Sequence, residues 1–462
     1  MATKLSDFLG HTVNVPDTFP TDVTFASGVK ETKETLSGTS VNLDPSTGTI
    51  KLHTLTGNTT YTESLRSGEY VTLVIEVASY TITWPTMVWT NNGGAAPDLT
   101  VNDFTFVTIW KVGSVLYGSL IGVNTRLVVA YVACSLADSL TSIDISNPSS
   151  LSQLDSFTSA GLDGAFGVAV DSTNGVAYVA ANQADSVVAI DISNPSSLAE
   201  LSTLTTPELE GSSRVRLDPV NSIAYVMSAK FVTDRFVGRL TSIDISDPSN
   251  LVQLDSFTSA GLDNARNFDI DPTNGVACVL GYNDAVITSI DISNPSSLAQ
   301  LDTFTSTDLA GPNAVAIDTI NNVAYVAARN ADRLVAIDIS NPSNLAQLDS
   351  FTSAALDGPM YLALDTTNGV AYVVSTLHVV DTITSIDISN PSSLVQLDSL
   401  ASSAIDRPEG ISLDLINGVA YVVSGDSTGS ITSIDISNPS ALSQLDTCTS
   451  ADLSGRRAVA LG

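Results

Sequence analysis

One nine-residue segment, Ile-Asp-Ile-Ser-Asn-Pro-Ser-Ser-Leu at positions 143–151, constrains this chain most, because near copies of it recur as far as the C-terminus. There are seven copies, and successive copies are 47, 53, 47, 47, 49 and 48 residues apart. A repeat of this length indicates units that bury their apolar surfaces only by packing on one another. The aspartates that mark the copies are Asp144, Asp191, Asp244, Asp291, Asp338, Asp387 and Asp435.

Each repeat predicts four short strands, which we name a to d in chain order. None of the apolar runs is long enough for a helix, and turn residues separate them. Asn174-Gly175 suits a tight hairpin between a and b, and Asn194-Pro195 suits a turn between c and d. Seven antiparallel four-stranded units predict an all-β, seven-bladed β-propeller. In the second repeat the runs are residues 165–170, 176–181, 187–192 and 198–204.

The two ends of the repetitive region predict that the propeller is a closed ring. The first repeat begins at strand b, residues 128–133, and the chain stops after a lone strand a, residues 457–461. Pairing these two strands would complete one blade and remove two exposed sheet edges. An open array would need capping repeats instead, and the sequence shows none.

The inner strands a and b are apolar throughout and rich in Ala, Val and Gly, as expected for strands that are covered on both faces. Strand b carries an aromatic residue at the same place in six repeats and a cysteine in the other one. We expect these side chains to pack between blades. They are Tyr131, Tyr178, Tyr225, Cys278, Tyr325, Tyr372 and Tyr421.

The repeat resembles a known type. Val-Ala-Tyr-Val-Ala-Ala at 176–181, then a polar link, then Val-Val-Ala-Ile-Asp-Ile-Ser-Asn-Pro at 187–195 is similar to the LVIVD-type propeller repeat. That repeat has a short apolar run, an aspartate and a following Asn/Asp-Pro turn. The resemblance covers residues 126–462. It implies a propeller of the kind found among cell-surface and extracellular proteins, and it implies no particular activity.

The front of the chain divides into two parts. Residues 1–36 are polar, without a convincing period, and we expect an extended N-terminal arm that orders where it docks. Residues 37–125 contain strand-like runs divided by Gly, Asn, Asp and Pro clusters, which predicts a small antiparallel β-sandwich. Core packing is expected for Trp84, Trp89 and Trp110. The remaining residues, 126–462, form the propeller.

A second resemblance concerns residues 37–123. Leu-Thr-Gly-Asn-Thr-Thr at 55–60, Tyr-Thr-Ile-Thr-Trp-Pro at 80–85 and Trp-Lys-Val-Gly-Ser-Val-Leu-Tyr-Gly at 110–118 look like a small β-domain of structural proteins of marine tailed phages. The resemblance implies a role in virion structure and in the attachment of appended modules, often in oligomers. It brings no catalytic residues with it.

Charge and composition limit the partners. The chain has 18 basic and 49 acidic residues, and the part after Arg126 has 11 and 38, a net charge of −27. Nucleic acid and anionic membranes are therefore not expected as partners. The N-terminus lacks a secretory signal and no run could span a membrane, so we expect folding in a host cytoplasm. Cys134, Cys278 and Cys448 are read as buried thiols.

The sequence offers few groups for catalysis. Its three histidines are scattered, and it contains no nucleophile elbow, P-loop, dinucleotide fingerprint or metalloprotease motif. The repeated aspartates lack the spacing of known calcium loops, and we expect them to cap turns, with structural calcium as the alternative. We therefore expect no catalytic residues, no cofactor and no metal site.

The two faces of such a disc should differ. The a–b and c–d turns form one face, here called the turn face, and they are nearly the same in every repeat. The b–c and d–a links form the other, the link face, where the repeats differ and where the one long insertion lies. The basic residues after Arg126 lie in or next to these links. They are Arg214, Arg216, Lys230, Arg235, Arg239, Arg266, Arg329, Arg333, Arg407, Arg456 and Arg457.

Arginine and aromatic side chains are favoured in contact sites, so we expect partner binding on the link face. The alternative is that the arginines only offset local acid and that the insertion is a solvated loop. The candidate binding residues are Lys230, Phe231, Arg235, Phe236, Arg239, Arg266, Arg329, Arg333, His378 and Arg407.

Together these observations indicate a tailed-phage protein displayed on the virion surface as a fibre, spike or decoration. Its arm and sandwich would bind other virion proteins, as a homo-oligomer, after assembly in the host cytoplasm. Its propeller would bind a host-surface glycan or protein, or a neighbouring virion subunit. One alternative is a glycan-degrading enzyme with carboxylates in the central funnel, although no unique pair of carboxylates stands out. The other is a cell-surface adhesin.

Overall fold

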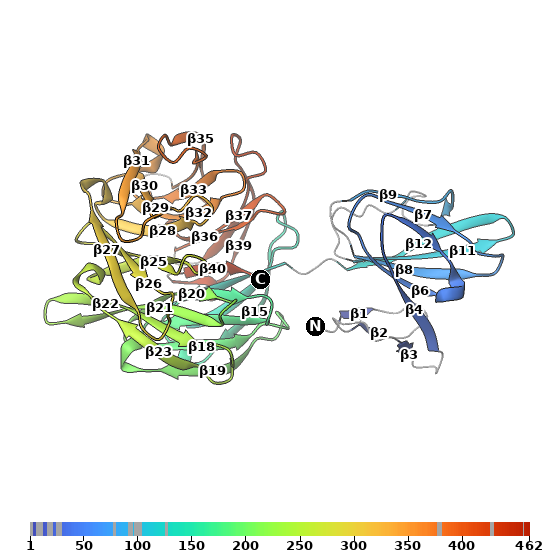
Figure 1. Ribbon diagram of the computed structural model, residues 1–462, viewed down its shortest axis with the longest axis horizontal. Coiled ribbons are helices and arrows are strands. Elements are labelled where there is room, and N and C mark those ends of the chain that lie inside the picture. The colour runs from blue at the N-terminus through green and yellow to red at the C-terminus, as the bar shows by residue number, and fades with distance from the viewer. Residues whose placement is uncertain are drawn as a thin grey trace. The chain divides into compact units, whose positions relative to one another are not determined.

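The computed structural model describes residues 3–5, 13–15, 22–24, 30–76, 80–90, 96, 104–124, 128–376, 381–425, 429–455 and 457–462. The chain forms two compact units, Met1–Leu127 and Val128–Gly462, and each is described here by itself. Across the described ranges the elements are β-strands and three-residue 3-10 turns, without an α-helix (Figure 1). None of the described segments is a helix that could cross a membrane.

The second unit is a seven-bladed propeller, as the repeats predict. Every blade is a four-stranded antiparallel sheet with strand a innermost and strand d outermost. We number the blades 1 to 7 in the chain order of their b strands. The a strands are β16 (Ala165–Asp171), β20 (Ser212–Asp218), β24 (Ala265–Asp271), β28 (Pro312–Asp318), β32 (Pro359–Asp365), β36 (Pro408–Asp414) and β40 (Arg457–Leu461). The b strands are β13 (Val129–Cys134), β17 (Val176–Ala181), β21 (Ile223–Val232), β25 (Val276–Gly281), β29 (Val323–Ala328), β33 (Val370–Ser375) and β37 (Val419–Ser424).

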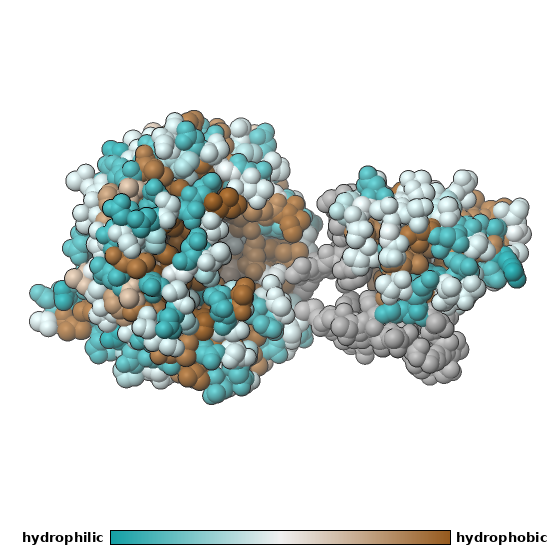
Figure 2. Space-filling view, in the orientation of Figure 1, coloured by the Kyte–Doolittle hydropathy of each residue, from teal (hydrophilic) through white to brown (hydrophobic). Residues whose placement is uncertain are grey.

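The outer strands complete each blade and are more exposed. The c strands are β14 (Ser139–Asp144), β18 (Ser186–Asp191), β22 (Arg235–Asp244), β26 (Val286–Asp291), β30 (Arg333–Asp338), β34 (Thr382–Asp387) and β38 (Ser430–Asp435). The d strands are β15 (Ser152–Thr158), β19 (Ala199–Thr205), β23 (Val252–Phe257), β27 (Ala299–Thr305), β31 (Ala346–Phe351), β35 (Val395–Ala401) and β39 (Ser443–Thr449). On the side of the propeller seen in Figure 2, the apolar residues form small patches among hydrophilic ones.

The ring closes through its terminal strand, as expected. Strand β40 pairs antiparallel with β13, from Ala130↔Leu461 to Cys134↔Arg457, and supplies the missing strand a of blade 1. The inner strand β40 also lies next to β36 on one side and next to β16 on the other. An apolar cluster shared by blades 1 and 7 fills this seam. The array is therefore continuous around the axis, without a free edge at its ends.

The tyrosines of strand b join neighbouring blades, which confirms the expected interblade packing. All six are buried. In five of them the hydroxyl donates to the carbonyl oxygen of the isoleucine that follows strand c there, at 3.2–3.4 Å. These bonds run from Tyr131 to Ile192, Tyr225 to Ile292, Tyr325 to Ile388, Tyr372 to Ile436 and Tyr421 to Ile145.

The repeated aspartates cap turns, as predicted. Asp144 in strand c accepts from the backbone N–H of Ser146 at 2.9 Å, which shapes the c–d turn. Asp155 in strand d accepts from the backbone N–H of Leu198 in the next blade at 2.8 Å. The same bond from Asp446 to Leu151, at 2.7 Å, crosses the closing seam. The repeated aspartates of strands c and d therefore stabilise turns and join neighbouring blades.

The first unit contains two packed sheets and a separate short hairpin of β1 (Thr3–Leu5) and β2 (Val13–Val15). One sheet has the strand order β10-β12-β11-β8-β6-β4-β3, and the other has the order β5-β7-β9. The large sheet comprises β3 (Asp22–Thr24), β4 (Lys30–Leu36), β6 (Ile50–Thr54), β8 (Tyr70–Glu76), β10 (Val88–Trp89), β11 (Phe104–Val112) and β12 (Val115–Asn124). The small sheet comprises β5 (Ser40–Leu43), β7 (Thr59–Glu63) and β9 (Ile82–Thr83).

The expected sandwich is present, but its strands are antiparallel only in part: β11 pairs antiparallel with β8 and β12, whereas other neighbours are parallel. From β4 to β10 the chain alternates between the two sheets, so β4, β6 and β8 are parallel neighbours in one sheet. In the other sheet β5, β7 and β9 are also parallel. Alternation of polar and apolar residues is the same in both arrangements, so the sequence pattern did not distinguish them. The sheet also includes Lys30–Leu36, which the sequence analysis gave to the arm.

A compact core holds the two sheets of this unit together. Leu43, Leu73, Ile75 and other apolar residues are buried between them. Trp84 stacks on buried Tyr61 at 5.5 Å between ring centroids, and Trp89 packs edge-on against Trp84. Trp110 instead stacks on Tyr117 at 5.7 Å.

Candidate ligand-binding site

A β-bulge near the start of six of the seven inner strands builds the candidate site. In blade 2, Ala165 pairs with Ala181 and Gly167 with Ala180, which leaves Phe166 without a partner on strand b. The same irregularity occurs in blades 3 to 7. Bulges redirect side chains and are common next to functional sites. The six bulged residues are Phe166, Ser213, Arg266, Asn313, Met360 and Glu409, and all of them line one pocket.

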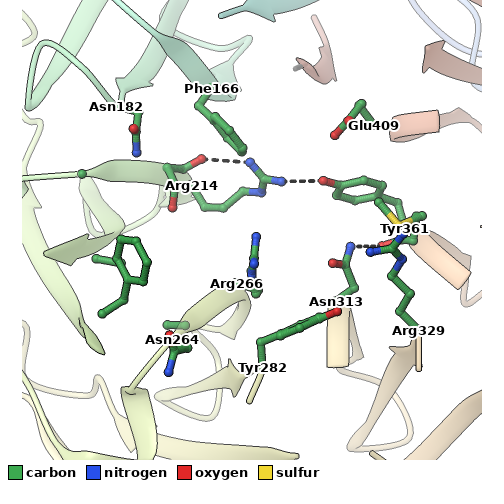
Figure 3. Close-up of a pocket in the computed structure, with 16 residues that line it drawn as sticks. Phe166, Asn182, Arg214, Asn264, Arg266, Tyr282, Asn313, Arg329, Tyr361 and Glu409 are labelled. Atoms are coloured by element: carbon green, nitrogen blue, oxygen red, sulfur yellow. Dashed lines mark hydrogen bonds between the residues drawn. The ribbon is translucent and has the colours of Figure 1, made fainter. Parts of the chain in front are cut away.

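This pocket lies at the link face, where the inner strands begin, and it has a volume of about 330 Å³. Figure 3 shows side chains from several blades pointing into it. Besides the bulged residues, its lining includes Arg214 and Tyr361, one position further along their strands. The surrounding links and the long hairpin of blade 3 contribute the rest of the polar and aromatic lining. These residues are Asn182, Phe236, Asn264, Tyr282 and Arg329.

Arg214 spans the pocket from blade 3 to blade 6. Its side chain donates to the Tyr361 hydroxyl at 2.9 Å and to the Ser213 carbonyl oxygen at 3.0 Å (Figure 3). Its guanidinium carbon lies 4.6 Å from the centre of the Phe166 ring. The residue is only 6% exposed, and it makes no ion pair with a carboxylate in the part of the chain that the structure describes. Burial lowers the pKa of Arg214, and Tyr361 and Glu409 partly oppose that shift.

The neighbouring Arg216 has the carboxylate partner that Arg214 lacks. It forms an ion pair with Asp269 of blade 4 at 2.9 Å. The other oxygen of Asp269 accepts from the backbone N–H of Ile317 in blade 5, also at 2.9 Å. This pair neutralises its own charge and joins three blades. Arg216 therefore has a structural role, whereas the charge of Arg214 is directed at the pocket.

The rim of the pocket combines a second arginine with polar side chains. The exposed Arg266 lies over the Tyr282 ring, with its guanidinium carbon 4.8 Å from the ring centre. The Tyr282 hydroxyl donates to the side-chain oxygen of Asn330 at 3.3 Å. Asn313 donates from its amide nitrogen to the Met360 carbonyl oxygen at 2.7 Å, which fixes the orientation of its side chain. The rim can thus present a cation, an aromatic ring and an amide to one ligand.

The insertion in blade 3 is an ordered hairpin whose tip is exposed to solvent. Strands β21 and β22 simply continue beyond the blade as paired strands, from Ser228↔Arg239 to Val232↔Arg235. The cross-strand Phe231 and Phe236 rings pack edge to face, with centroids 5.1 Å apart. These two residues are 59% and 47% exposed.

The basic residues of this hairpin are already engaged within the chain. Lys230 pairs with Glu210, and Arg235 pairs with Asp263, each at 2.5 Å. Arg239 donates to the Pro207 carbonyl oxygen at 3.2 Å. Their charges are therefore less available to a ligand than those of Arg214 and Arg266.

The structure separates the predicted binding residues into groups. Phe236, Arg266 and Arg329 line the pocket. Arg333 begins β30 and is paired with Asp308 at 3.5 Å, outside the pocket lining. Arg407 is exposed and immediately precedes β36. His378 lies outside the described residues.

Sequence reasoning placed Arg214 beside a link and left it out of the candidate site, whereas it lies within β20 and its side chain crosses the pocket. Tyr361, Phe166, Asn313 and Glu409 were also missed. A signal for them exists in the sequence. When the repeats are aligned, one position of strand a holds Phe, Ser, Arg, Asn, Met and Glu in turn, while strand b remains nearly constant.

The pocket offers little for hydrolysis of glycosides. Of the residues that line it, Glu409 alone carries a carboxylate. Hydrolysis by the usual route needs two carboxyl groups that face each other about 5–10 Å apart. Nor do the described residues contain a group of three or more His, Cys, Asp or Glu side chains that could hold a metal ion. The arrangement is suited to binding.

Comparison with known proteins supports the propeller and its repeat type. The model of the LVIVD repeat matches residues 130–158, 172–206, 232–258, 277–305, 313–352, 371–400 and 415–449. No curated protein matches the chain.

Three solved structures share the fold. A protein of unknown function from Desulfotomaculum acetoxidans is 13% identical with a TM-score of 0.60, over 72% of this chain and 98% of its own. A Lactobacillus plantarum protein is 14% identical with a TM-score of 0.59, over 72% and 99%. A Bacteroides uniformis protein provisionally assigned as a 6-phosphogluconolactonase is 12% identical with a TM-score of 0.60, over 73% and 100%.

At these identities the three structures share the fold and carry no information on activity. The repeat matches are more specific, because each falls on strands of a single blade. The second unit of this chain is thus a closed seven-bladed propeller built from LVIVD repeats, one in each blade.

Proposed function

We propose that this protein is a binding module that recognises its partner through the link face of the propeller, with the pocket at its centre. The observation that carries the proposal is the ring of six bulged residues, which differ from blade to blade and converge on one pocket. A scaffold that only filled space would repeat the same residue there. Preformed pockets of a few hundred cubic ångströms with few, convergent polar groups are typical of ligand sites.

The path of the chain also favours the link face as the binding surface. Val128 and Gly462, the first and last described residues of the propeller, both lie at the turn face, where Gly462 donates to the Val129 carbonyl oxygen at 3.0 Å. The chain therefore enters the propeller at the turn face. Loops held by a rigid scaffold, away from the points of attachment, are well placed to meet a partner.

The setting that we propose is the surface of a tailed-phage virion, with the protein as a fibre, spike or decoration. The N-terminal unit would attach it to other virion proteins as a homo-oligomer, and the propeller would bind a host-surface glycan or protein or a neighbouring subunit. This part rests on the resemblance of residues 37–123 to phage structural domains. Immunogold labelling of particles with an antibody against the full chain tests it, and label absent from particles would contradict it.

A glycan array tests the binding role. The full chain should bind one or more glycans, and the double variant Arg266→Ala, Arg329→Ala should lose most of that signal. Val220→Ser is the matched control, because Val220 is 90% exposed in an a–b turn on the opposite face, and this variant should bind like the parent. Absence of binding to every glycan would rule out a glycan as the partner, and equal loss in the control would contradict recognition through the link face. Release of cleaved glycan on prolonged incubation would indicate an enzyme instead.

A further inference from the structure

From the charge and shape of the pocket we infer that its ligand is an anionic saccharide, a sugar ring that bears a carboxylate or sulfate group, held by Arg214. This inference deepens the proposed function and rests on it. It specifies the chemical class of the ligand and the side chain that selects it. Three features of the propeller support it: the buried charge of Arg214, the mixed lining around that side chain, and the distribution of charge over the propeller.

Arg214 is a buried cation to which no carboxylate of the described residues is bonded. Removing a guanidinium from water is costly, and the cost is usually offset by a carboxylate in direct contact. Its two hydrogen bonds to protein go to a neutral carbonyl oxygen and a neutral hydroxyl. A guanidinium has five N–H donors. The remaining donors, directed into a pocket of about 330 Å³, match the two oxygens of a carboxylate or sulfate.

The lining around Arg214 favours a sugar over a simple ion. Phe166, Tyr282 and Tyr361 supply aromatic rings for the apolar C–H face of a sugar. Side-chain oxygens of Asn313 and Glu409 can accept from sugar hydroxyls, because the amide nitrogen of Asn313 is already bonded to the Met360 carbonyl oxygen. A bare inorganic anion would use none of these groups. A neutral sugar would leave the guanidinium without its partner.

The acidic character of the propeller does not prevent an anionic ligand from binding in the pocket. The part of the chain after Arg126 has a net charge of −27, which repels anions at long range. At physiological ionic strength charges more than about 8 Å away are largely screened. Within the pocket the lining contains Arg214, Arg266 and Arg329 against Glu409, so the local charge is positive. Elsewhere in the propeller, repeated aspartates are engaged in turns, as Asp144 is, or between blades, as Asp155 is.

Isothermal titration of the full chain with four probes tests the inference. The probes are glucuronate, glucose 6-sulfate, glucose and inorganic sulfate. We expect at least one of the two charged sugars to bind, and whichever binds identifies the anionic group. Glucose and inorganic sulfate should each bind about tenfold more weakly or worse, because each lacks one half of the contacts.

Variants assign the selectivity to Arg214. In Arg214→Met, which has a similar volume, the preference for the charged sugar over glucose should disappear. Arg214→Lys keeps the charge and loses the planar fork, so it should restore part of the affinity. Val220→Ser, at a 90% exposed position on the turn face, should leave both affinities unchanged.

The outcomes separate this inference from the proposed function. If glucose binds as well as the charged sugars, and binding depends on Arg266 and Arg329, the pocket is a binding site and the anionic ligand is wrong. If inorganic sulfate binds as tightly as glucose 6-sulfate, the saccharide part is wrong. If no glycan binds at this face, both the anionic saccharide and the glycan partner of the proposed function are wrong.

Discussion

The hydroxyl of Tyr421 donates to the carbonyl oxygen of Ile145, 3.3 Å away, across the seam where the last blade meets the first. The same bond joins Tyr372 to Ile436 at 3.4 Å, between two blades that are consecutive in the chain. The closing seam therefore uses the same contact as an internal one. Both tyrosines are almost fully buried.

This equivalence predicts that Tyr421→Phe and Tyr372→Phe lower stability by similar amounts. Each change removes one buried hydroxyl and leaves a carbonyl oxygen with one partner fewer, which costs about 1–2 kcal/mol. Thermal and urea unfolding of the full chain measure both effects. If the ring opened between blades 7 and 1, Tyr421→Phe would leave the stability unchanged, whereas Tyr372→Phe would still lower it.

Stability should fall steeply at alkaline pH. An unfolded tyrosine ionises near pH 10, whereas burial raises the pKa of Tyr131, Tyr178, Tyr225 and Tyr372 to about 12. The folded state thus keeps protons that the unfolded state loses, and stability is lost from about pH 10 up to about pH 12. Each pKa unit corresponds to about 1.4 kcal/mol per tyrosine.

Urea midpoints measured at increasing pH, together with tyrosinate absorbance of the folded protein, check this loss. Tyr131→Phe should make the decline shallower. Ionisation of all tyrosines near pH 10 in protein that is still folded would contradict the burial that holds the blades together.

The hairpin of blade 3 should contribute to binding through an aromatic residue more than through its charges. Phe236 lines the pocket, whereas Arg235 and Arg239 are bonded to Asp263 and to the Pro207 carbonyl oxygen. We expect Phe236→Ala to weaken ligand binding several-fold and the pair Arg235→Gln, Arg239→Gln to change it little. Replacement of all three should leave folding intact, since the hairpin extends beyond the blade. Circular dichroism would check the folding of these variants, and titration would measure their ligand affinity. A larger loss of affinity in the arginine pair than in Phe236→Ala would mean that the charges of the hairpin contribute more than its aromatic residue.

Arg214 should reduce stability in the absence of ligand. Its guanidinium is buried, and none of the carboxylates in the described ranges is bonded to it. An apolar side chain of similar volume avoids that desolvation. We therefore expect Arg214→Met to leave the Tm of the full chain unchanged or higher, by up to about 1–3 kcal/mol in free energy of unfolding. A clear decrease in Tm would mean that the bond to Tyr361 and the packing on Phe166 outweigh the cost of burial, so Arg214 would be structural.

The sequence predicted the propeller well, because its repeats encode local structure directly. The Asn-Pro turns, the tyrosines of strand b and the lone terminal strand each specify a contact that recurs in every blade or at the seam. The N-terminal unit lacks such repetition. Its chain crosses between two sheets after Leu43 and again after Thr54, a long-range choice that the alternation of polar and apolar residues does not record.

The site was harder to predict than the fold. The candidate residues were chosen by charge and by position in links, which favoured Lys230 and Arg235, both of which are paired with acids in the structure. Arg214 was counted among the basic residues next to links and left out of the candidate site, whereas it lies within β20. A bulge beside Ser213 places it there, and bulges depend on how two strands register. Its partner Tyr361 is 147 residues away in sequence.

The central claim is that the ligand occupies the pocket on the link face, against Arg214. Hydrogen exchange of the full chain, followed by mass spectrometry with and without saturating glucuronate or glucose 6-sulfate, locates the ligand directly. We predict slower exchange in peptides that contain Arg214, Arg266 and Tyr361, and no change in the c–d turns such as residues 147–150. Slower exchange confined to those turns or to the N-terminal unit would contradict the account.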